Sequence, residues 1–108
     1  MEQLKEHVRA IADDIHKGII GLPVGSTGPE MLSGFDYLND ALDIQYIVTG
    51  QGEYIGARIL VAYGGPNIWV NTHTGIVEGY WYGDYATGAF LNDPMDINGA
   101  CRELWECK

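Results

Sequence analysis

The apolar residues near the start of the chain have a helical spacing. Residues 2–17 are predicted to form an amphipathic helix, because apolar side chains recur at positions i, i+4, i+7 and i+11. The members of this stripe are Leu4, Val8, Ile11 and Ile15. Gly18 is expected to end the helix in the left-handed conformation. A loop rich in Gly, Pro and Ser over residues 19–34 and a short helix over residues 35–42 should follow.

From residue 42 the apolar period changes from 3.6 to 2, which is the period of half-buried strands. Strands are predicted over residues 42–49, 55–63, 68–72 and 76–85, with short Gly-rich turns between them. Short turns make neighbouring strands antiparallel. The segment after residue 85 is expected either to extend the fourth strand past a bulge or to form a fifth strand at the edge.

A last helix is predicted after residue 92. Asp93 is the expected N-cap and Pro94 the first helical residue, and apolar residues follow at helical spacing. The chain is therefore predicted to be a single α+β domain over residues 1–108. A four- to five-stranded antiparallel meander forms one layer of this two-layer fold, and the N- and C-terminal helices pack on one face of it.

The charge balance narrows the possible partners. Fifteen Asp and Glu residues against six Lys and Arg residues give a formal net charge of −9. Nucleic acid and anionic membranes repel such a surface, so neither is expected as a direct partner, whereas a basic protein fits. No segment has the pattern of a signal peptide or approaches the ~20 apolar residues of a membrane span. Cys101 and Cys107 are too far apart on one helix to pair with each other, and a cytoplasmic location is expected.

His73 is the candidate for catalytic chemistry. A general base needs an orienting partner and a site that excludes water, and a zinc site needs three or four ligands. His7 and His16 lie on different faces of the first predicted helix and far from His73 in sequence. We therefore interpret His73 as the solvated tip of a hairpin and predict no catalytic residue, no metal and no cofactor. The alternative is a small enzyme or small-ligand binder in which His73 pairs with Glu78 or Asp84.

The sequence GYWYGDY over residues 79–85 places aromatic side chains on both faces of the fourth predicted strand. One face must be core, so the other should expose aromatic rings beside acidic side chains, and Trp69 and Tyr54 could join them from neighbouring strands. Tyr and Trp dominate binding hot spots. Cross-strand pairs that only stabilise the sheet are the alternative. The residues predicted to bind a partner are Trp69, Glu78, Tyr80, Tyr82 and Asp84.

A longer run, YIGARILVAYGGPNIWVNTHTGIVEGYWYGDY, together with the closing acidic helix, resembles small uncharacterised acidic proteins of bacterial mobile elements and prophages. The resemblance implies a setting in which small acidic proteins inhibit host machinery, and it assigns no residue a role. The predicted function is a non-enzymatic protein-binding module that binds a basic, nucleic-acid-handling protein through its acidic and aromatic sheet face. A homodimer that buries the same face is a further alternative.

Overall fold

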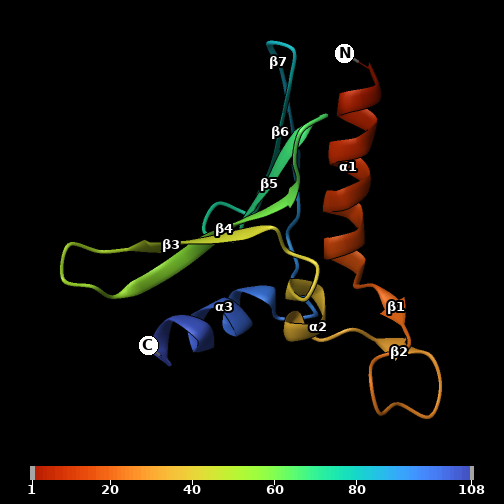
Figure 1. Cartoon of the computed structure of the whole chain (residues 1–108), viewed down its shortest axis with the longest axis vertical. Helices are drawn as coiled ribbons and strands as arrows, with labels where there is room; N and C mark the ends of the chain where they lie inside the picture. Colours follow the sequence, from red (N-terminus) through yellow and green to blue (C-terminus); the bar gives the residue numbers. More distant parts are fainter. Residues whose placement is uncertain (1, 108) are drawn as a thin grey trace.

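Two antiparallel sheets and three helices make up the computed structural model, which describes residues 2–107 (Figure 1). The strands β3 to β7 form a five-stranded meander in which each strand pairs with the next. The predicted fold class is therefore confirmed. In chain order the elements are α1 (Glu2–Lys17), β1 (Ile20–Gly21), β2 (Glu30–Met31), α2 (Gly34–Leu38), β3 (Asp43–Val48), β4 (Tyr54–Ala62), β5 (Asn67–Asn71), β6 (Ile76–Trp81), β7 (Asp84–Ala89) and α3 (Ile97–Glu106).

The helices cover one face of the twisted meander. α1 lies along β6 and β7, and α3 packs against α2 and β4 (Figure 1). Glycines let α1 approach β6 and β7 closely, since a Cβ atom added at Gly79 would lie 2.5 Å from Val8 Cγ2 and one added at Gly88 would lie 3.2 Å from Ala12 Cβ. The apolar face of α1 is fully buried there, and its members are Leu4, Val8, Ala12 and Ile15. Within residues 2–107, no helix is both long and apolar enough to cross a bilayer.

The predicted end of the fourth strand, at residue 85, is wrong. β6 stops at Trp81, and the chain reverses through Tyr82 and Gly83, whose φ angles are 51° and 82°. Two successive residues with positive φ are typical of a type I′ hairpin turn. β7 is consequently the fifth, edge strand that the sequence left as one of two options. The tyrosine at the first turn position concealed the turn, because aromatic residues usually indicate a strand.

The start of the last helix is also later than predicted. α3 begins at Ile97, and its N-cap is Asp96, which adopts a left-handed conformation and accepts a hydrogen bond from the Gly99 amide at 3.1 Å. Asp93 closes a turn before the helix, where the Asp96 amide donates to its carbonyl. The Asp93 carboxylate still caps the start of the helix, since it accepts hydrogen bonds from the Ile97 amide at 2.9 Å and the Asn98 amide at 3.0 Å.

Tyr54 lies on the covered side of the sheet, not among the exposed aromatic residues. Irregular pairing between Ile47 and Val48 on β3 shifts the alternation at the start of β4. The Tyr54 ring packs against the core, and its hydroxyl donates to Asn98 Oδ1 at 2.8 Å. The Thr72 hydroxyl donates to the same oxygen at 2.8 Å, so Asn98 joins the start of α3 to the sheet.

Stability should fall as the solution becomes strongly alkaline. Burial raises the pKa of Tyr54 and of Tyr37 to about 12, and it raises the pKa of the Cys101 thiol to about 11. The folded state therefore favours the protonated tyrosine and thiol groups. These groups stabilise the fold fully below their ordinary pKa values near 9–10, and this stabilisation is lost as the pH rises through the raised pKa values. Urea unfolding at pH 8, 10 and 11.5 should show a loss of stability concentrated between about pH 9 and 12.

The variant Tyr37→Phe removes one of these titrating groups without removing its ring. Its stability should depend less steeply on pH over the same interval. Ultraviolet titration supplies the control, because the wild type should show one more tyrosine ionising at about pH 12 than Tyr37→Phe does. If Tyr37 ionised near pH 10 instead, the role of burial would be contradicted.

Candidate functional site

The side of the meander that faces away from the helices forms the candidate site. Alternate residues of the central strands point to the core, among them the fully buried Ile59, Ile68 and Val77. The residues between them point to the other side of the sheet. There Leu60 on β4 pairs with Trp69 on β5, and Trp69 pairs with Glu78 on β6. We call this surface the open face and define it by Arg58, Leu60, Trp69, Glu78, Tyr80 and Tyr85.

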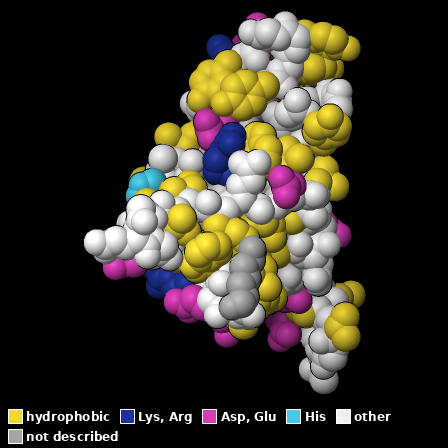
Figure 2. All heavy atoms as spheres, turned by 60° about the vertical axis from the view of Figure 1, so that its left-hand side comes forward, with side chains coloured by type: hydrophobic (Ala, Val, Ile, Leu, Met, Phe, Trp, Pro, Cys, Tyr) yellow, Lys and Arg dark blue, Asp and Glu magenta, His cyan; other side chains and the backbone are white. Residues whose placement is uncertain are grey.

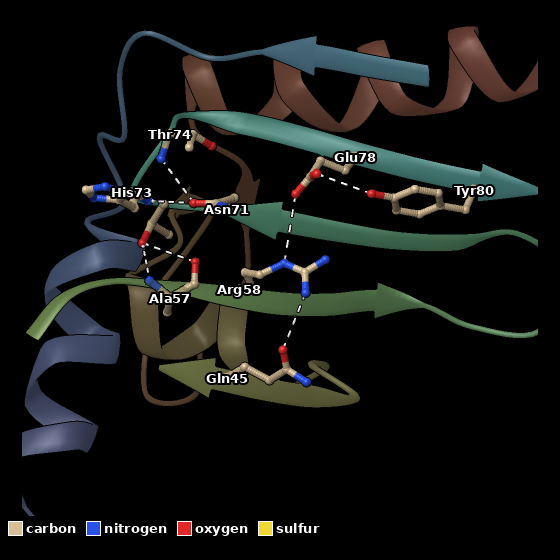
Figure 3. Close-up of polar contacts among 9 residues, drawn as sticks. Gln45, Ala57, Arg58, Asn71, His73, Thr74, Glu78 and Tyr80 are labelled. Carbon is tan, nitrogen blue, oxygen red and sulfur yellow. Dashed lines mark hydrogen bonds and ion pairs between the residues drawn. The ribbon is translucent and has the colours of Figure 1, made fainter. Parts of the chain in front are cut away.

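Arg58 lies at the centre of the open face. Its Nε is 3.9 Å from Glu78 Oε1, as Figure 3 shows. Its guanidinium carbon is 4.4 Å from the centroid of the Trp69 ring. Its Nη1 donates to Gln45 Oε1 at 3.4 Å. These long, partly solvated contacts are individually weak. The positive charge of Arg58 balances the negative charge of Glu78, so the centre of the open face is less acidic than the sequence suggests.

The aromatic pair on the open face involves a residue that the sequence did not assign to the site. Tyr80 and Tyr85 are partners across β6 and β7, with ring centroids 4.9 Å apart. The Tyr80 hydroxyl donates to Glu78 Oε2 at 3.3 Å, and burial followed by the Glu78 charge raises its pKa, so it remains a donor. Tyr85 could have been found from sequence only by recognising the turn at residues 82–83, which sets the pairing.

The predicted binding residues divide into two groups. Trp69, Glu78 and Tyr80 lie together on the open face. Tyr82 is at the tip of the β6–β7 hairpin, where 87% of it is exposed. Asp84 pairs with Trp81 across β6 and β7, next to the Tyr80–Tyr85 pair. Successive pairs point to opposite sides of a sheet, so Asp84 points toward the side that the helices cover. The open face therefore carries three of the five, and the other two lie at its end.

An open groove of about 410 Å³ lies at this end of the sheet, and we call it the tip groove. Residues of the β6–β7 hairpin form one wall. Pro66 in the connection from β4 to β5 and Asn67 at the start of β5 contribute the other. Figure 2 shows hydrophobic side chains gathered at the end of the molecule that holds this hairpin. Aromatic rings thus continue from the open face into the tip groove.

His73 is in the turn at the opposite end of β6. Its Nδ1 lies 3.1 Å from the Ile55 carbonyl oxygen, and its amide donates to Asn71 Oδ1 at 2.9 Å (Figure 3). Asp84 follows the far end of β6, which is roughly 17 Å long at about 3.3 Å per residue. Glu78 is in contact with Arg58 and Tyr80. The structure therefore places His73 in a hairpin and away from the two carboxylates considered as its partners.

A polar hollow of about 420 Å³ does lie beside His73. Its carboxylates belong to Asp93 and Asp96, which accept hydrogen bonds from amides at the start of α3. The hollow is thus lined by groups that cap a helix. Over residues 2–107, the His, Cys, Asp and Glu side chains nowhere form a group of three that could hold a metal ion.

Comparison with known proteins adds no assignment, since no family model, no curated protein and no solved structure matches the chain. The function must therefore be argued from the open face and the tip groove.

Proposed function

We propose that this protein is a non-enzymatic binding module whose open face docks on a basic protein. One observation carries the proposal: the helices pack on one side of the sheet, and Trp69, Tyr80 and Tyr85 present aromatic surface on the other. Large aromatic side chains that are partly exposed and contiguous are the usual anchors of protein interfaces. The polar groups between them would fix the orientation of the partner.

The charge of the whole protein supports a basic partner. A formal charge of −9 on 108 residues creates a negative potential that attracts positively charged proteins and accelerates their encounter. The same charge disfavours a homodimer through this face, because two copies would repel each other. Nucleic-acid-handling proteins are a suitable class of partner, since an acidic surface can occupy the site that otherwise holds phosphates.

Substitution of Trp69 tests the proposal directly. Trp69→Ala removes the ring at the centre of the open face and should weaken binding by about 30-fold or more, as expected for a hot-spot residue. The partner would be captured from host lysate on the immobilised wild-type protein and identified. Its affinity would then be measured by calorimetry at about 50 and 500 mM salt, and the higher salt should weaken it by screening.

Phe35→Ala is the matched control, because Phe35 is an exposed aromatic residue on α2, away from the sheet. It should bind the partner as the wild type does, and thermal unfolding should show that both variants fold. Equal affinity for Trp69→Ala and wild type would reject the open face as the binding surface. A captured partner without excess positive charge would reject the claim that the partner is basic.

A further inference from the structure

We infer that an extended segment of the basic partner pairs with β7 as a sixth strand of the meander and places an apolar side chain in a groove between β7 and α1. The inference rests on the proposed function for the identity of the partner, and it names how that partner is held. β7 is the last strand of the meander (Figure 3) and adjoins the open face, because its residue Tyr85 belongs to that face. One partner can therefore contact both surfaces.

The outer edge of β7 carries backbone groups that are available for pairing. The Phe90 amide donates to the Gly75 carbonyl at 2.9 Å, so the alternation of the antiparallel ladder turns the amides and carbonyls of Tyr85, Thr87 and Ala89 away from β6. Within residues 2–107, no strand lies beyond β7 and no loop backbone bonds these groups. The outward groups repeat about every 6.8 Å, a spacing that another extended chain matches.

β7 lacks most of the features that protect edge strands from pairing. It contains no Lys or Pro, its one charged residue is at its first position, and its pairing with β6 has no bulge. The other edge of the sheet is different. The register of β3 shifts between Ile47 and Val48, and its residue Tyr46 packs against Trp105 of α3 with ring centroids 5.4 Å apart. β7 is therefore the edge better suited to pair with another strand.

A groove of about 590 Å³ lies beside this edge, between β7 and α1, and we call it the edge groove. Ala10 of α1, Ala89 of β7 and Leu91 contribute apolar surface to it, and Leu91 is 89% exposed. Arg9 and Asp13 also line it, and their opposite charges offset each other. The edge groove therefore suits an apolar side chain better than a charged one.

His16 holds one end of the edge groove together. Its Nδ1 accepts hydrogen bonds from the Leu91 amide at 3.2 Å and from the Asn92 amide at 3.3 Å. These bonds fix the chain that follows β7 against the last turn of α1. The Leu91 side chain is thus kept beside the groove although most of it is in contact with solvent.

Size and charge favour a basic partner over a second copy of this chain as the added strand. A strand paired with β7 turns alternate side chains toward α1. β7 itself presents Asp84, Ala86 and Gly88 to that side, and none of these is a large apolar residue that would fill the edge groove. Two molecules of charge −9 also repel each other, whereas a basic segment is attracted. The expected occupant is an extended segment that alternates basic residues with larger apolar ones.

The peptide acetyl-Lys-Val-Lys-Leu-Lys-Val-Lys-amide is the probe. In an antiparallel sixth strand its lysine amides face Tyr85, Thr87 and Ala89, and its apolar side chains face α1. NMR of the ¹⁵N-labelled protein should show saturable shifts over residues 84–91, and the Thr87 and Ala89 amides should exchange with solvent at least about tenfold more slowly. No protection of these two amides at about 2 mM peptide, or equal protection along β3, would overturn the inference.

Two methylated analogues test whether backbone pairing holds the peptide. N-methylation of the two inner lysines removes donors that face β7, and it should weaken binding about tenfold or more. N-methylation of the two valines alters amides that face solvent, and it should change the affinity by no more than about twofold. Equal losses in both analogues would mean that charge alone attracts the peptide, and they would overturn the inference.

Thr87→Pro removes one outward amide and leaves the ladder to β6 intact, because an edge strand tolerates Pro where its N–H faces away from its neighbour. It should bind the peptide at least about fivefold more weakly, whereas Thr87→Val keeps the amide and should bind like the wild type. Circular dichroism would show that both variants fold. Unchanged affinity in Thr87→Pro would contradict the pairing, and if this variant failed to fold, the methylated analogues would still decide.

Leu91→Ser tests the edge groove separately. It removes apolar surface from the groove, and the affinity for the peptide should fall about threefold or more. Leu42→Ser is the matched control, because Leu42 is also an exposed leucine but precedes β3 at the other edge of the sheet. Equal affinities of the two variants would remove the groove from the inference.

The outcomes for the edge and for the proposed function are distinguishable. If Trp69→Ala loses the captured partner and Thr87→Pro retains it in full, the inference fails and the binding face stands. If the peptide protects Thr87 and Ala89 but no basic partner is captured, the proposed function fails instead. A diffusion coefficient that falls with protein concentration, together with protection of Thr87 in the absence of peptide, would mean that a second copy pairs with β7 and would overturn the inference.

Discussion

Replacing Gly79 with valine should lower the free energy of unfolding by about 3 kcal/mol, because overpacking at this position pushes against the buried face of α1. A Cβ atom at Gly79 would lie 2.5 Å from Val8 Cγ2 and 2.9 Å from Leu4 Cδ1. Val8 has few rotamers with which to yield, so the helix itself must move. In a protein of this size the melting temperature should fall by about 12 °C or more.

Calorimetric unfolding would measure this change, with Gly50→Val as the matched control. Gly50 lies in the turn after β3, and an added Cβ atom there would meet no atom within 4 Å. The control should therefore unfold within a few degrees of the wild type. A melting temperature for Gly79→Val close to that of Gly50→Val would mean that α1 does not pack on β6 as described.

Asp93→Ala should cost about 2 kcal/mol of stability, because it leaves two amides at the start of α3 without their acceptor. Both oxygens of this carboxylate are used, Oδ1 by the Ile97 amide and Oδ2 by the Asn98 amide. Charged acceptors make the stronger hydrogen bonds of proteins. The loss should loosen the junction where Asn98 joins α3 to Tyr54 and Thr72.

Two other variants identify the cause. Asp93→Asn keeps one oxygen acceptor and should lose about half as much stability as Asp93→Ala. Asp40→Ala removes an exposed carboxylate and should have little effect or stabilise slightly, since it reduces the repulsion within a protein of charge −9. Chemical unfolding would rank the three variants. If Asp40→Ala and Asp93→Ala were equally destabilised, the capping bonds would not be the cause.

The open face is more aromatic and less acidic than the sequence alone suggested. Glu78, one of the predicted binding residues, is in contact with Arg58 and Tyr80. What remains available on the open face is mainly ring surface, with acidity supplied by the molecule as a whole. Such a surface would bind through aromatic anchors, while charge would govern the rate of encounter.

Local periodicity determined much of this fold. The spacing of Leu4, Val8 and Ile15 is sufficient to predict an amphipathic helix, because burial of one helical face depends on a repeat of 3.6 residues. Alternation likewise identified Ile68 and Val70 as one side of a strand and Trp69 as the other. These features depend only on residues close together in the chain, so the sequence can reveal them.

Contacts between distant segments decided the rest. The sequence did not reveal that Arg58 would reach Glu78, that Tyr85 would pair with Tyr80, or that Tyr54 would pack beneath α3. Each depends on strand register, and a bulge or a two-residue turn changes which residues face each other. Periodicity thus predicted which side chains could be exposed together. Only the tertiary structure determined which of them meet, because register depends on turns and bulges as well as on the packing of the sheet on its helices.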